Sequence, residues 1–177
     1  MPAVQQSALI VPVPEVEPVV GTHRAGLDAN AVKGVPAHVT VLYPFLPPAQ
    51  IDDEVRGTLR DLFATQTPFD VTFTEVRWFG DQVTWLAPQP DLAFRQLTAA
   101  VWGHFPETPP YAGEHDGDHP HLTFGHGHPV ETLKQAADDV SPQLPVSATI
   151  ASVHLIAGSD APDSWRPVEV FTLGNQV

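Results

Sequence analysis

Two stretches of the chain repeat the same alternation of polar and apolar side chains. The first reads HVTV over residues 38–41 and the second reads HLTF over residues 121–124, 83 residues further along (121 − 38). Successive side chains of a β-strand point to opposite faces, so each stretch predicts a strand with one apolar face and one face that carries an imidazole and a hydroxyl. The fold must therefore bury two apolar faces while it leaves the two polar faces accessible.

The elements around these stretches indicate an internal repeat. Each predicted motif strand is followed by a helix and two further strands, an order typical of duplicated units. We therefore predict an α+β fold with a bilobal, pseudo-twofold arrangement, in which each lobe is an antiparallel sheet with helices and the two motif strands line a central cleft. The whole chain, 1–177, is expected to form this one two-lobed domain. The expected strands are 7–13, 37–43, 69–79, 83–87, 120–124, 144–156 and 168–173; the expected helices are 51–66, 91–102 and 129–140; 21–36 is expected to be irregular and 103–118 to be a long loop.

Composition narrows the class of protein. The chain has 8 basic and 21 acidic residues, a net charge of −13 and no cysteine. Non-specific binding to duplex nucleic acid or to an anionic membrane needs clustered Lys and Arg, so neither partner is expected. The absence of cysteine excludes disulfides and thiolate chemistry, and no signal peptide or membrane span is indicated. We expect a cytoplasmic monomer.

The two imidazoles and two hydroxyls suit displacement at phosphorus. Such a reaction needs proton acceptance on one side of the phosphorus and proton donation on the other, and histidine titrates near neutral pH. His38 and His121 are therefore the candidate acid and base, and Thr40 and Thr123 the candidate donors to the phosphate oxygens. No metal or other cofactor is required. A single histidine in a strand is more often structural; the equivalent placement of the two pairs favours catalysis.

Four further residues are candidates for substrate contacts. Arg24 precedes the first motif and would supply the positive charge that the acidic chain lacks, although a surface ion pair is the simpler alternative. Tyr111 in the long loop, Phe45 and Trp85 are candidates for stacking against a base, although aromatic side chains in strands more often belong to a core.

A histidine-rich tract at residues 115–128 offers another interpretation. It contains five His and two Asp, and such tracts can bind zinc or nickel, although solvated loop histidines are the simpler explanation.

A third possibility for the function of the chain is a nucleotide-binding module that keeps the cleft but does not turn over its ligand.

The chain resembles the two-histidine phosphoesterase superfamily, in its bacterial 2'-5' RNA ligase-like, or cyclic phosphodiesterase, branch. Three segments together carry the resemblance: PAHVTVLYPF (36–45), RWFGDQVTWLAP (77–88) and HPHLTFG (119–125). The resemblance implies metal-independent and ATP-independent chemistry on a 2',3'-cyclic phosphate or a 2'-5' phosphodiester of a small nucleotide or an RNA end. It also implies that His38 and His121 are the acid and base and that Thr40 and Thr123 bind phosphate. Many relatives carry a basic residue shortly after the second motif, whereas this chain has Gly125 and His126, which weakens the expectation of polynucleotide binding there.

Overall fold

Two four-stranded antiparallel sheets form the centre of the protein. The computed structural model describes residues 5–113 and 119–174. The strand order is β2-β1-β7-β8 in the first sheet and β5-β4-β3-β6 in the second. The strands are β1 Gln6–Pro12, β2 His38–Leu42, β3 Phe69–Phe79, β4 Val83–Gln89, β5 Leu122–His126, β6 Val146–Ile150, β7 Ser152–Gly158 and β8 Arg166–Thr172.

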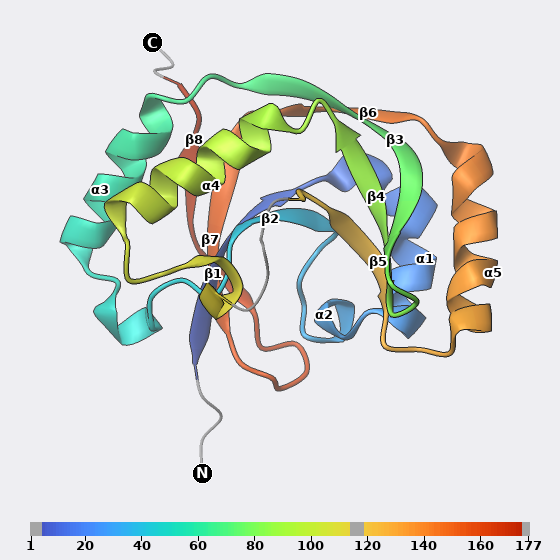
Figure 1. Ribbon diagram of the computed structural model, residues 1–177. Helices are drawn as coiled ribbons and strands as arrows, with labels where there is room; N and C mark the ends of the chain where they lie inside the picture. Colours follow the sequence, from blue (N-terminus) through green and yellow to red (C-terminus); the bar gives the residue numbers. More distant parts are fainter. Residues whose placement is uncertain (1–4, 114–118, 175–177) are drawn as a thin grey trace.

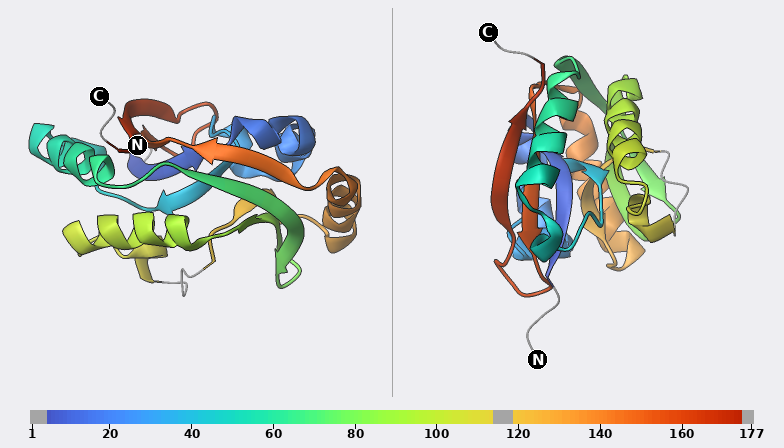
Figure 2. Two further views of the ribbon diagram at one scale, coloured as in Figure 1. Left: turned by 90° about the horizontal axis from the view of Figure 1, so that it is seen from above. Right: turned by 90° about the vertical axis from the view of Figure 1, so that its left-hand side faces the viewer.

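Helices gather at the two ends of the molecule (Figure 1). Helices α3 and α4 contact the first sheet, and α1 and α5 contact the second. The left panel of Figure 2 shows the same grouping from above. The α-helices are α1 Glu17–Leu27, α2 Ala29–Val32, α3 Asp53–Ala64, α4 Leu92–His104 and α5 Val130–Val140, and short 3₁₀ segments are assigned to Pro14–Val16, Pro48–Gln50, Pro110–Gly113 and Ser141–Gln143.

The motif strands β2 and β5 occupy equivalent positions in the two sheets. Each is an edge strand, and the two strands contact each other. This arrangement confirms the predicted α+β fold of two antiparallel sheets with helices. The predicted alternation is also present, because Val39, Val41, Leu122 and Phe124 are buried, whereas the His and Thr side chains of both motifs are only half-buried.

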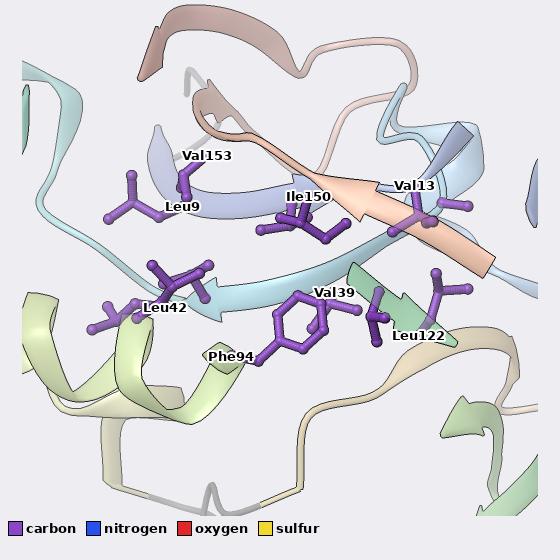
Figure 3. Packing of buried hydrophobic residues seen from close by; sticks show 14 of the residues in the cluster. Leu9, Val13, Val39, Leu42, Phe94, Leu122, Ile150 and Val153 are labelled. Carbon is purple, nitrogen blue, oxygen red and sulfur yellow. The ribbon is translucent and has the colours of Figure 1, made fainter. Parts of the chain in front are cut away.

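One hydrophobic cluster joins the two sheets. It contains Leu9 and Val39 from the first sheet, Leu122 and Ile150 from the second, and Phe94 from α4. Figure 3 shows these side chains in a single packed region between β1, β2 and β5. Burial of these apolar faces in the shared core turns the polar faces of β2 and β5 away from it.

The structure differs from the sequence-based expectation in two places. Residues 21–36 were expected to be irregular, but they contain most of helix α1 (17–27) and the short helix α2 (29–32). Helix α1 shows the physical reason. Its two glycines lower the intrinsic helix propensity, but tertiary packing of Val20 and Arg24, both buried, favours the helix. The single strand expected at 144–156 is two strands, and the chain passes at Ala151 from β6 in the second sheet to β7 in the first.

Helix α1 holds the segment that leads into β2. Arg24 Nη2 donates to the carbonyl oxygen of Val35 at 2.9 Å, and its Nε donates to Asp28 Oδ2 at 3.1 Å. Nearer the start of the helix, Glu17 Oε1 accepts a hydrogen bond from the amide of Ala37 at 2.8 Å. The backbone is thus fixed at residues 35 and 37, directly before the first motif histidine.

Within residues 5–113 and 119–174, no helix combines the length and apolar character needed to cross a bilayer.

Replacing Arg24 by Met is expected to destabilise the fold strongly. Both side chains of the Arg24–Asp28 pair are about 95% buried, so the substitution leaves a buried carboxylate without its cation. We expect the free energy of unfolding, measured by urea denaturation, to fall by about 3 kcal/mol. The double variant Arg24→Met with Asp28→Asn should recover part of this loss, since no buried charge remains.

The matched control is Arg77→Met, which removes the guanidinium of the half-exposed Arg77–Glu75 pair. An exposed pair contributes less than about 1 kcal/mol. Equal losses for the Arg24 and Arg77 variants would contradict a structural role for the buried pair.

Candidate functional site

A cavity of about 610 Å³ takes its lining from both sheets. Three of the four motif residues, Thr40, His121 and Thr123, lie in its wall. His38 is not among the residues that line it. It precedes Thr40 by two positions on the same face of β2, and it lies close enough to His121 for that charge to act on its pKa.

The two motif histidines are held in the same way. The Nδ1 atom of His38 lies 2.7 Å from the carbonyl oxygen of Pro36, and Nδ1 of His121 lies 2.7 Å from that of His119. A carbonyl oxygen can only accept a hydrogen bond, so Nδ1 carries the proton in both rings. In the neutral form of each imidazole, the lone pair is therefore on Nε2.

The environment of His38 favours the neutral imidazole. Desolvation by the surrounding protein lowers the pKa of His38 to about 4, while its hydrogen bond to the Pro36 carbonyl opposes this shift. The positive charge of Arg24 lowers the pKa further and the carboxylate of Asp28 raises it. At neutral pH, His38 is accordingly uncharged and able to accept a proton.

Aromatic rings surround His121. The ring of Phe79 meets the imidazole edge-on at a centroid distance of 5.1 Å, and Trp85 does so at 5.7 Å. Tyr111 lies nearly parallel to it at 6.3 Å. These contacts fix the orientation of the imidazole, and π-systems also attract a cationic ring.

Tyr111 lines the cavity, as does Thr40, with which its side chain forms a hydrogen bond. Burial raises the pKa of the Tyr111 hydroxyl, and the bond to Thr40 opposes that shift. Its backbone has a φ of 54°, in the left-handed region, and its amide donates to the carbonyl of Tyr43 at 2.6 Å. A non-glycine residue in this region needs such support from its surroundings.

The structure does not place the other three substrate-contact candidates in the cavity wall. Arg24 is 3% exposed and its guanidinium is engaged by Asp28 and the carbonyl of Val35, so it influences His38 through its charge and through the backbone that it holds. Phe45 is buried in the core, with its ring packed edge-on against another phenylalanine ring. Trp85 is buried against Phe79, and its Nε1 has no hydrogen-bond acceptor among the described residues.

Several residues that line the cavity could not be recognised as site residues from the sequence. Gln6 accepts a hydrogen bond from the Tyr43 hydroxyl at 3.0 Å, and Lys33 forms an ion pair with Asp160 at 3.3 Å. Trp165 joins them from the segment before β8. Only the pairing of β1 with β2 and β7 brings these distant segments together, so local sequence patterns could not indicate them.

The fixed charges of the cavity wall are Lys33, Asp28 and Asp160. Residues 114–118, which include the start of the histidine-rich tract, lie outside the described part of the chain. Within the part that is described, no cluster of three or more His, Asp or Glu side chains is arranged to hold a metal ion.

Solved structures with this fold include Escherichia coli LigT in complex with 3'-AMP, at 21% identity and a TM-score of 0.58, covering 97% of this chain and 99% of LigT. The protein TT0787 of Thermus thermophilus has 17% identity and a TM-score of 0.66, covering 97% of this chain and all of that one. A further structure, described as a phosphoesterase, has 19% identity and a TM-score of 0.61, covering 97% and 99%. No curated protein sequence matches the chain significantly.

The family model of the 2'-5' RNA ligase superfamily matches residues 12–161, a range that includes both motif strands and the hairpin between them. On this match, together with the paired edge strands and their equivalent histidines, the chain belongs to the 2'-5' RNA ligase superfamily of two-histidine phosphoesterases.

Proposed function

We propose that the protein is a metal-independent phosphodiesterase that opens a 2',3'-cyclic phosphate, or cleaves a 2'-5' phosphodiester, at a nucleotide or an RNA end. The observation that supports this most directly is the pair of equivalently held imidazoles, each with Nδ1 on the carbonyl oxygen two residues earlier, so that both rings have the same tautomer. The Thr40 and Thr123 side chains in the cavity wall provide hydroxyl donors for the non-bridging phosphate oxygens.

The environments of the two histidines suggest their roles in hydrolysis. His38, neutral in its desolvated surroundings, accepts a proton from water through Nε2 while the water oxygen forms a bond to phosphorus. The phosphorus bond to the leaving ribose oxygen breaks, and His121 donates its proton to that oxygen. The aromatic rings around His121 accommodate the cationic imidazole that this role requires.

A nucleotide phosphate is the ligand class that the comparisons favour. LigT, which shares the fold, has been crystallised with 3'-AMP, NADP+, ATP and phosphate. Hydrolysis is preferred over ligation for this chain, because water is abundant and a net charge of −13 disfavours holding two RNA ends together.

Replacement of either motif histidine is expected to abolish most of the activity. His38→Ala and His121→Ala should each lower kcat on a 2',3'-cyclic nucleotide by about 100-fold or more, since each removes a proton-transfer group. The assay follows product formation by chromatography with a chelator present. His128→Ala, which changes an exposed histidine outside the cavity, is the matched control and should retain full activity. Wild-type rates in both motif variants would refute the proposal.

The alternative of a binding module makes a different prediction. Such a protein would be stabilised thermally by a nucleotide 3'-phosphate but would form no product from the cyclic nucleotide. Thr40→Val and Thr123→Val should weaken that stabilisation, because each removes a hydroxyl donor from the cavity. Turnover by the wild-type protein decides in favour of the enzyme.

The rate should depend on pH through His38. The pKa of His38 in the protein without bound ligand is about 4, so this base is already deprotonated at pH 5. The acidic limb of kcat/KM should therefore have its midpoint near pH 4, well below the ordinary histidine value of about 6.5. A bound phosphate anion favours the imidazolium and raises this pKa, so the acidic limb of kcat should lie at higher pH. An acidic limb of kcat/KM at the ordinary histidine value would contradict the assignment of His38 as the base.

A further inference from the structure

A second cavity, of about 240 Å³, adjoins the first. Thr40, Tyr43 and Tyr111 line both cavities, so the two cavities share a boundary at these residues, one of which is the proposed phosphate ligand Thr40. A terminal ribose at this boundary could place its base in the first cavity and direct its 5'-phosphate, and with it the preceding nucleotide, into the second. The terminal nucleotide is assigned to the first cavity, and the proposed opening of a cyclic phosphate assigns no group to the second.

One face of helix α4 forms the outer wall of the second cavity. Arg95, Thr98, Ala99 and Trp102 follow the 3, 4, 7 spacing of a single helical face. The Thr98 hydroxyl donates to the carbonyl oxygen of Val41 in β2 at 2.7 Å. This hydrogen bond ties the helix to the motif strand and fixes the rotation that presents Arg95 and Trp102 to the cavity.

The charged side chain that lines this cavity is basic, although the protein as a whole is acidic. Arg95 is the only lining residue among the described ones with a permanent charge, whereas the chain as a whole carries a net charge of −13. Its partner Asp91, at 3.0 Å, is about as solvent-exposed as Arg95 itself, and such an exposed pair is weak. A phosphate can therefore replace Asp91 as the partner of Arg95.

Trp102 supplies a flat apolar surface at the same place. Its exposure is 45%, and among the described residues it is the only aromatic side chain in the set of exposed large hydrophobic residues. An exposed indole beside an arginine is the combination that stacks against a base while the cation contacts the backbone.

We propose that the second cavity binds the nucleotide preceding the terminal one in an RNA end, with Trp102 against its base and Arg95 at its phosphate. This inference rests on the proposed function, and it makes an RNA end of at least two nucleotides the preferred substrate. The net charge of −13 gives no support for binding of a longer tract.

The test compares cytidine 2',3'-cyclic phosphate with a dinucleotide, ApC, that ends in the same cyclic phosphate. In the wild-type protein, kcat/KM should be about tenfold or more higher for the dinucleotide. Trp102→Ala should reduce this ratio to near one, and Trp102→Phe, which keeps an aromatic face, should restore most of it. Leu92→Ala, which changes an exposed apolar residue on the same helix outside the cavity, is the matched control and should leave the ratio unchanged.

Arg95→Gln should lower the dinucleotide preference and weaken its dependence on salt, whereas Lys134→Gln, which removes an exposed cation on α5, should do neither. Two results would overturn the inference: a wild-type ratio of kcat/KM near one, or a ratio that is unchanged in Trp102→Ala. In either case, activity on the mononucleotide would still support the proposed function.

If neither substrate is turned over, the proposed function fails, and the cavity is tested by binding instead. Isothermal titration calorimetry with ApC 3'-phosphate and with 3'-CMP should then show tighter binding of the dinucleotide, lost in Trp102→Ala. Equal affinities for the two ligands would overturn the inference.

Discussion

The apolar core shared by the two sheets is the constraint on which the site depends. Val39 of β2 and Leu122 of β5 point into the same cluster, so both edge strands are fixed in register and in orientation (Figure 3). A slip of one residue in either strand would bury its histidine and expose its apolar face. The hydrophobic effect therefore places the polar faces of the motifs, although none of the core residues takes part in the proposed chemistry.

The two motif histidines share one backbone contact but differ in their surroundings. Each Nδ1 lies on the carbonyl oxygen two residues earlier, which fixes the tautomer in both rings. Burial and the nearby charge of Arg24 lower the pKa of His38, whereas His121 sits among aromatic rings. A pseudo-symmetric fold can thus present two unlike groups, as a displacement that needs both an acid and a base requires.

The role of Arg24 could not be predicted from its residue type and its place in the sequence. Its position before the first motif made it a candidate for direct phosphate binding, but α1 turns it inward to the backbone of Val35 and to Asp28. That helix has weak local signals, because Gly21 and Gly26 lower its propensity and its stability comes from packing. The inward position of Arg24 follows from this packing, which no local pattern reports.

The sequence by itself determined which side chains share a face, because the period-two geometry of a strand is local and the alternation around His38 and His121 is regular. It also determined the overall class of fold and the family. Only the tertiary structure decided which strand edges meet, and which distant residues, such as Gln6 and Trp165, complete the cavity. These features depend on non-local pairing of β1 with β2 and β7 and on the packing of α1 and α4, which bring together segments that no sequence periodicity connects.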